Sequence, residues 1–308
     1  MAKKTDEPIT LEDISSAIKK LDQRETLVIK IDWWLGRVIA MAWPISELAK
    51  TRKVKVITSR PLVFWWNPYI ESVHWLDDRD LFRQVIKGND YLELEPYTDH
   101  RFFNDWVNRL EIARDKLGLK EVVPPALFLA EHEKLSNFLQ GRPVLFQPFW
   151  STMDINGADK SYRSFRIWDA QYVADCLTQA WYTLYEVIKP NAQPKLRGCQ
   201  ILDTPNLRRV VTLCDRYPVI WCDSCLHHAS KAFGKKAVVM RAWTDAGRFG
   251  YDTSINLWEQ WMKEYTPMRL WINDFNFDVI NQYSNVFTKQ FLDKFVAESL
   301  NLLQSRYK

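Results

Sequence analysis

The sequence has no long hydrophobic run, which excludes a protein with membrane-spanning helices. No uninterrupted apolar stretch reaches the roughly 18 residues that a membrane-spanning helix requires. The first 25 residues are charged and lack the apolar segment of a secretory signal. We therefore expect no signal peptide and no membrane span, and we expect a cytoplasmic location.

Cysteines are also few, and internal repeats and low-complexity tracts are lacking. The five cysteines all lie in the later half of the chain: Cys176, Cys199, Cys214, Cys222 and Cys225. An odd count without a secretory signal favours reduced thiols over a disulfide framework.

A strong charge of either sign is lacking as well. The net charge is +4 at pH 7, which suits an anionic ligand but is well below that of a dedicated nucleic-acid-binding protein.

Aromatic residues are the abundant class, with 15 Trp, 16 Phe and 12 Tyr. They supply large buried areas and also stack on sugars and bases, so they suit a core and a ligand surface alike.

Apolar strands alternate with amphipathic helices along the chain, which predicts an α/β fold with mostly parallel sheets. We expect two Rossmann-like domains, residues 1–140 and 141–280, and a final helix in 281–308 that packs back across both. Three local predictions are a short leading helix from Thr10, a helix at 43–53 and a strand at 126–130 followed by a helix.

The stretch WCDSCLHHASKAFGKKAVVM gathers the most chemically active side chains. Cys222, Cys225 and the two histidines have the residue types of a zinc site, but adjacent histidines diverge on a helix and no second ligand pair has suitable spacing. A redox CxxC pair should open a helix, and a pairing of Ser224 with His228 lacks a nucleophile elbow. The remaining interpretation is a strand that ends at Cys222 and a following helix whose N-terminus binds phosphate.

This stretch, together with the later WTDAGRFGYD, resembles the C-terminal signature of the family 9 glycosyltransferases, the ADP-heptose:lipopolysaccharide heptosyltransferases. The family pattern reads D-S-G-x-x-H-x-A-x-A-x-G-K-P-V-V and then G-x-T-D-x-x-R-x-G-P. The matching positions are Asp223, Ser224, His228, Ala232, Gly234, Lys235, Thr244, Asp245, Arg248 and Gly250. The resemblance implies a GT-B fold, in which two Rossmann-like domains face a cleft and the C-terminal domain contacts the donor diphosphate and sugar.

The N-terminal half carries a second part of the resemblance. LVIKIDWWLGRVIAMAWPISELAK is similar to the family's L-V-I-R-x-x-x-L-G-D-x-x-x-x-x-P-x-x-x-x-L, and FRIWDAQYVADCL, with Arg166, to its K-x-W-x-x-E-x-F-x-x-L. Two departures stand out. Cys225 replaces a glycine, and Arg37 replaces the aspartate that the family uses as catalytic base. Because arginine does not accept a proton at neutral pH, the base has either moved or been lost.

The predicted site residues fall into three groups. Open α/β sheets bind ligands beyond the carboxyl ends of their strands, so we predict Asp99 as the base, with Asp32 as second candidate and Glu95, His100 and Asp105 nearby. The resemblance implies a donor site of Asp223, Ser224, His228, Lys235, Thr244, Asp245, Arg248 and Arg166. The acceptor site is predicted to contain Gly36, Arg37 and Trp34.

The predicted function is an inverting glycosyltransferase that moves a sugar from a nucleotide sugar to an acceptor hydroxyl, with no cofactor and no strict need for a metal. The acceptor is either a bacterial glycan of the lipopolysaccharide type or a hydroxymethylated base in phage DNA. The T-even phage DNA glucosyltransferases share the GT-B fold, and a flipped base needs stacking and phosphate contacts. The residues available for those contacts are Trp33, Trp34, Trp65, Trp66 and Arg37. The alternative is a catalytically degenerate GT-B protein that binds a sugar nucleotide or a partner without turnover. Donor identity, anomeric outcome and oligomeric state stay open.

Overall fold

The structure is a computed structural model. It describes residues 26–31, 35–76, 91–105, 107–135, 138–149, 164–188, 193–202, 207–241, 246–259 and 287–307. The leading helix expected from Thr10 lies outside these residues, and within them no helix is long and apolar enough to cross a membrane.

The first half of the chain forms a four-stranded parallel sheet in the order β3-β2-β1-β4. Its strands are β1 (Thr26–Lys30), β2 (Lys53–Thr58), β3 (Ser72–Trp75) and β4 (Leu92–Glu93). Its helices are α2 (Leu35–Ala49), α4 (His100–Asn104) and α5 (Arg109–Leu117), with 3₁₀ turns η1 (Pro61–Phe64) and η2 (Pro96–Thr98). In β1 the residues alternate between buried and half-buried, as expected for a strand with unlike faces.

The second half forms a six-stranded parallel sheet in the order β10-β9-β8-β5-β6-β7. Its strands are β5 (Pro143–Gln147), β6 (Thr183–Glu186), β7 (Gln200–Ile201), β8 (Val219–Cys222), β9 (Ala237–Met240) and β10 (Ile255–Leu257). Its helices are α7 (Ile167–Gln179), α8 (Leu207–Arg216), α9 (Cys225–Ala232), α10 (Ala246–Phe249) and α13 (Lys289–Arg306). Every residue of β8 and β9 is buried, which is typical of parallel strands covered by helices on both faces.

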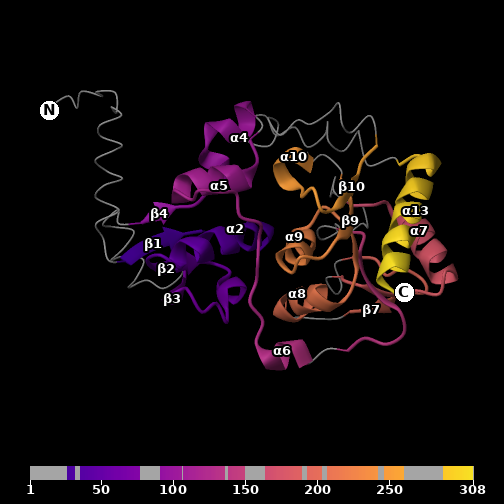
Figure 1. The fold of residues 1–308 in the computed structure, drawn as a ribbon. Helices are drawn as coiled ribbons and strands as arrows, with labels where there is room; N and C mark the ends of the chain where they lie inside the picture. Colours follow the sequence, from indigo (N-terminus) through magenta and orange to yellow (C-terminus); the bar gives the residue numbers. More distant parts are fainter. Residues whose placement is uncertain are drawn as a thin grey trace.

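The predicted α/β fold with parallel sheets is confirmed. The two sheets lie side by side, and a connecting segment that contains α6 (Glu131–Leu135) runs between them (Figure 1). The second sheet begins at Pro143.

Helix α2 begins earlier than the sequence predicted. The expected start was at residue 43, whereas the helix runs from Leu35 and carries Pro44 in its interior. Proline removes one backbone hydrogen bond and usually marks a helix start. Here burial outweighs that loss, because α2 is buried over most of its surface against η1, α5 and α9.

One other prediction differs from the structure. The expected strand at 126–130 is extended chain outside both sheets, and the Phe128 carbonyl accepts a hydrogen bond from Arg208 instead of from a neighbouring strand. Packing of the final helix α13 across both domains stays a prediction. The main partners of α13 are α7 and β9, because Phe291, Phe295 and Leu303 are buried in the core of the second sheet (Figure 1).

Candidate active site at the seam between the two sheets

The start of α9 has the predicted strand, turn and helix geometry. Strand β8 ends at Cys222, Ser224 caps the helix, and α9 begins at Cys225. The Ser224 hydroxyl accepts from the Leu226 N–H at 3.3 Å and donates to the Gln147 side chain at 2.7 Å. The cap satisfies one of the free N–H groups of the helix end, which carries partial positive charge.

Helix α2 meets the first turn of α9 at Gly36. We call the contact of α2 and α5 with α9 and α10 the seam; α2 and α9 lie between the two sheets in Figure 1. A Cβ atom on Gly36 would lie 2.8 Å from Cδ2 of His228 and 3.1 Å from Cα of Cys225. Only glycine permits this approach, which brings the N-terminal ends of two helices together.

Arg109 crosses the seam from the first turn of α5. Its NH2 group lies 3.0 Å from Nδ1 of His228 and donates to the Phe249 carbonyl at 2.9 Å. The Tyr251 hydroxyl lies 2.8 Å from the same Nδ1. Arg109 is only 2% exposed, and its hydrogen-bond partners among the described residues are the His228 imidazole, the Phe249 carbonyl and the Tyr251 hydroxyl. This buried cation therefore has no carboxylate partner within the described part of the chain.

Arg241, directly after β9, is a second buried cation, and it is paired within the second half of the chain. It donates to the Asp223 carboxylate at 2.7 Å and to Asn256 at 3.0 Å. Nearby His227 contacts the Ser224 carbonyl through Nδ1 at 2.6 Å. Burial, and then the charge of Arg241, lower the pKa of His227 to about 3, so this imidazole is neutral at pH 7 and serves to hold the turn.

Arg248 and Asn108 tie α10 to the first half of the chain. The Arg248 guanidinium lies 5.6 Å from the ring centroid of Phe102, and the Arg248 side chain is 1% exposed. The Asn108 amide donates to the Gly247 carbonyl at 2.6 Å. The predicted residue Arg248 thus lies at the seam and contacts the opposite half of the chain.

Arg37 forms an ion pair with Glu95 at the edge of the seam. Arg37 is in the first turn of α2, and Glu95 follows β4; their side chains are 10% and 12% exposed. Lys116 of α5 donates to the Glu95 backbone carbonyl at 2.8 Å. Arg37 stands where the family that the sequence resembles has an aspartate. The Glu95 carboxylate lies next to it.

Asp99 has a structural role that the sequence did not indicate. It caps α4 and accepts hydrogen bonds from the Arg101 backbone N–H at 3.0 Å and from the Arg101 guanidinium at 2.8 Å. These contacts lower the pKa of Asp99 to about 2. Both carboxylate oxygens of Asp99 are thus bound by Arg101, which commits this side chain to the cap of α4.

The remaining predicted residues are not joined to the seam by these contacts. Lys235 lies beyond the far end of α9, 3.7 Å from Asp215, and Arg166 caps α7 and pairs with Asp169 at 2.6 Å. Asp32, Trp34, Thr244 and Asp245 lie outside the described residues. His100 is exposed.

Sequence reasoning missed Arg109, Arg241 and Tyr251. Arg241 directly follows the buried strand β9, and a cation at that place in a parallel sheet is a recognisable signal. Arg109 carried no such signal, because its role depends on how the two halves pack together.

The thiols at the start of α9 show no metal geometry. Burial raises the pKa of the Cys225 thiol to about 12, so it is protonated at neutral pH and is not a ready ligand or nucleophile. In the described ranges, no group of three or more His, Cys, Asp or Glu side chains is arranged to hold a metal ion.

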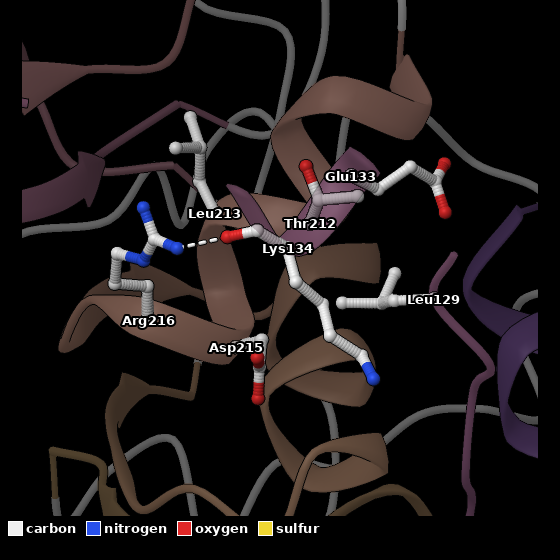
Figure 2. A pocket seen from close by; sticks show the side chains of 7 residues that line it. All are labelled: Leu129, Glu133, Lys134, Thr212, Leu213, Asp215 and Arg216. Atoms are coloured by element: carbon white, nitrogen blue, oxygen red, sulfur yellow. Dashed lines mark hydrogen bonds between the residues drawn. The ribbon is translucent and has the colours of Figure 1, made fainter. Parts of the chain in front are cut away.

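A small pocket lies away from the seam, between α6 and α8 (Figure 2). It is lined by Leu129, Glu133, Lys134, Thr212, Leu213, Asp215 and Arg216. Its charged groups have protein partners: Arg216 donates to the Lys134 carbonyl, and Glu133 pairs with Arg208 (Figure 2 shows the first contact). The pocket belongs to the connection between the two halves.

The fold is shared with solved glycosyltransferases. The family 9 glycosyl transferase from Veillonella parvula DSM 2008 is 12% identical, with a TM-score of 0.62 over 91% of this chain and 97% of that chain. The dodecameric iron-containing heptosyltransferase TibC from enterotoxigenic E. coli H10407, solved with ADP-D-beta-D-heptose, is 14% identical, with a TM-score of 0.63 over 92% of this chain and 79% of that chain. E. coli ADP-heptose lps heptosyltransferase II is 13% identical, with a TM-score of 0.54 over 90% and 99% of the two chains.

At these identities the likeness establishes the fold, and the GT-B prediction is confirmed. No protein-family model matches the sequence, and comparison with curated protein sequences gives no match.

Proposed function

We propose that the protein is an inverting glycosyltransferase that binds the diphosphate of a nucleotide sugar at the seam. The observation that carries this proposal is Arg109, a buried cation whose described hydrogen-bond partners, an imidazole, a carbonyl and a hydroxyl, carry no negative charge. Burying a charge is costly unless an opposite charge compensates it. A diphosphate between the two halves would supply that charge.

The surroundings of Arg109 favour an anion. The N-termini of α2 and α9 converge at Gly36, and each favours negative charge. Asp223 fixes Arg241, and the Ser224 cap keeps the first turn of α9 in place. We assign the donor diphosphate to this turn, with Ser224 and His228 nearest to it and Arg248 on the α10 side.

The neighbours in the fold comparison favour an ADP-sugar donor and a glycan acceptor. The structure of TibC contains ADP-D-beta-D-heptose, and another neighbour is an ADP-heptose lps heptosyltransferase. We therefore propose a donor of the ADP-heptose class and an acceptor of the lipopolysaccharide type. This choice sets aside both a DNA base as acceptor and a protein without turnover.

The proposed chemistry is a displacement at the anomeric carbon. As the bond from that carbon to the diphosphate breaks, negative charge grows on the leaving oxygen. Arg109 and the first turn of α9 would stabilise this charge in a dry site, where fixed donors act more strongly than in water. Their contribution is larger in the transition state than in the bound donor, which is what catalysis requires.

Calorimetry with ADP, UDP, GDP and ADP-heptose tests the donor site. We expect ADP and ADP-heptose to bind, and we expect the double variant Ser224→Ala, His228→Ala to weaken binding by about 10-fold or more, as for lost hydrogen bonds to a charged group. The matched control is Ser305→Ala, in the last turn of α13 on the second half of the chain. If none of the four nucleotides binds, or if the double variant binds as well as the wild type, the proposal is wrong.

A further inference from the structure

The ion pair of Arg37 with Glu95 suggests that Glu95 replaces the aspartate absent from position 37. Arg37 occupies the place where the resembling family has its aspartate, and the structure brings the Glu95 carboxylate onto that arginine. The two residues are 58 positions apart and belong to different elements, α2 and the segment after β4. Their contact therefore depends on the fold and could not be predicted from the sequence.

We propose that Glu95 is the general base that takes the proton from the acceptor hydroxyl, with Arg37 as its positioning residue. This inference rests on the proposed glycosyltransferase function and names a catalytic residue for it. The proposal differs from the sequence prediction, which favoured Asp99 and Asp32.

The position of Glu95 fits this role. It lies just beyond the carboxyl end of β4, where parallel sheets place their ligands. Its partner Arg37 directly follows Gly36, and Gly36 touches His228 at the proposed donor site. The carboxylate thus lies beside the proposed donor site, on the half of the chain expected to hold the acceptor.

Glu95 is also held firmly. Lys116 donates to its backbone carbonyl at 2.8 Å, and the Thr98 hydroxyl donates to the same oxygen at 2.9 Å. A guanidinium favours the charged form of a neighbouring carboxylate, and only the charged form accepts a proton. A base must be both correctly placed and ionised, and these contacts provide both conditions.

The proposed step balances in atoms and charge. The Glu95 carboxylate takes the proton of the acceptor hydroxyl while that oxygen bonds to the anomeric carbon. The bond from the anomeric carbon to the diphosphate oxygen breaks, and its electron pair leaves with the nucleoside diphosphate. Glu95 then loses the proton to water.

Two neighbouring acids serve as comparisons. Glu93 is on the same strand end, pairs with Lys30 at 2.9 Å and is exposed, so it is a matched control. Asp99 caps α4 and is bound by Arg101, so its loss should affect the local helix.

The test uses the full-length protein, ADP-heptose as donor and heptose-deficient lipopolysaccharide as acceptor, with release of ADP as the readout. Glu95→Gln keeps the size of the side chain but does not act as a base. We expect it to lower the rate by about 100-fold or more, with ADP affinity within error of the wild type. The unfolding midpoint should fall because Arg37 loses its carboxylate partner, so the rates are compared at a temperature where both proteins are folded. Glu93→Gln should retain the wild-type rate.

Two further variants separate chemistry from packing. Glu95→Asp should recover part of the rate. The exchange Arg37→Asp, Glu95→Arg returns a carboxylate to the family position and should be faster than Glu95→Gln alone. In the wild type the rate should fall as the pH drops and the carboxylate is protonated, and this acid limb should disappear in Glu95→Gln.

The outcomes distinguish this assignment from the function on which it rests. A wild-type protein that binds no ADP and releases none from ADP-heptose overturns the function and the assignment together. An active wild type with Glu95→Gln equally active overturns only the assignment. The same holds if Asp99→Asn abolishes the reaction while Glu95→Gln does not.

Discussion

Two buried arginines lie where the two halves of the chain meet, and they have different partners. At the linker junction, defined as Arg208 with Leu62, Phe128 and Glu133, a buried arginine reaches from α8 to the first half and the connecting segment. It donates to both oxygens of the Glu133 carboxylate, at 2.8 and 2.9 Å, and to the Leu62 carbonyl at 3.1 Å. At the seam, the equally buried Arg109 meets an imidazole, a carbonyl and a hydroxyl.

The difference indicates that Arg208 stabilises the fold, whereas Arg109 is suited to bind a ligand. A buried arginine paired with a carboxylate is complete within the protein. One that meets only uncharged acceptors leaves a positive potential that an anion can use. The contrast supports the proposed placement of the nucleotide at the seam, and variants of the two arginines can test it.

The largest expected effect is at the linker junction. Arg208→Met removes the cation and leaves Glu133 partly buried without its partner, which should lower the free energy of unfolding by about 3–5 kcal/mol. Chemical denaturation checks this value, with Arg209→Met at the next, exposed position as control. Equal stability of the two variants would contradict the role given to the junction.

Glu186 is a buried acid, in contrast to the buried arginines, and it has no ion pair in the described ranges. Its Oε2 accepts from the Leu196 N–H at 3.0 Å, and Oε1 has no hydrogen-bond partner there. Burial raises the pKa of Glu186 from 4.5 to about 7. Because the folded pKa lies above the unfolded one, its contribution to stability is fully present below pH 4.5 and is lost as the pH rises through 7.

The expected loss across this pH range is up to about 3 kcal/mol, at 1.36 kcal/mol per pH unit of separation. Denaturation at pH 5 and at pH 8 should show a smaller difference in Glu186→Gln than in the wild type. Glu71→Gln, at a half-exposed site paired with Lys55, should leave the difference unchanged. An identical pH dependence in wild type and Glu186→Gln would show that this carboxyl is not the source.

The smallest expected effect, and the sharpest test of the seam, is Arg109→Met. It should weaken ADP binding by about 10- to 100-fold, as for one or two lost charge-assisted hydrogen bonds, or roughly 1.4–2.7 kcal/mol. Stability without ligand should stay the same or rise, because a buried charge is replaced by an apolar side chain of similar length. Arg114→Met on the same helix, where the arginine pairs with Asp115, is the control for calorimetry and denaturation. Strong destabilisation with unchanged ADP affinity would place Arg109 in the same class as Arg208.

The sequence predicted those features that depend on local patterns. Strand periodicity and burial predicted the parallel sheets, and the Asp-Ser pair after β8 predicted the helix N-terminus at Ser224. The predicted start of α2 was wrong, since Pro44 marks a helix start in an isolated segment but not in one buried on most sides. The strand expected at 126–130 has the right composition, but a strand also needs a neighbour with which to pair.

The charges at the seam were harder to predict, because they depend on packing between the two halves. Arg37 looked like the loss of a catalytic acid until the fold placed Glu95 beside it. Asp99 looked like a free loop acid, whereas Arg101, only two residues away, holds it as a helix cap. Arg109 and His228 are 119 positions apart, and no periodicity connects them.

The close approach at Gly36 also has a consequence for the speed of binding. Because α2 lies against the first turn of α9, we expect a diphosphate at the proposed donor site to bind only after these two helices separate. Helices α2, α8 and α9 share one apolar core, so this separation has to break apolar contacts and should be slow. In stopped-flow experiments the observed association rate should therefore level off at high nucleotide concentration, at the rate of opening. Gly36 would then set how often the protein admits its ligand.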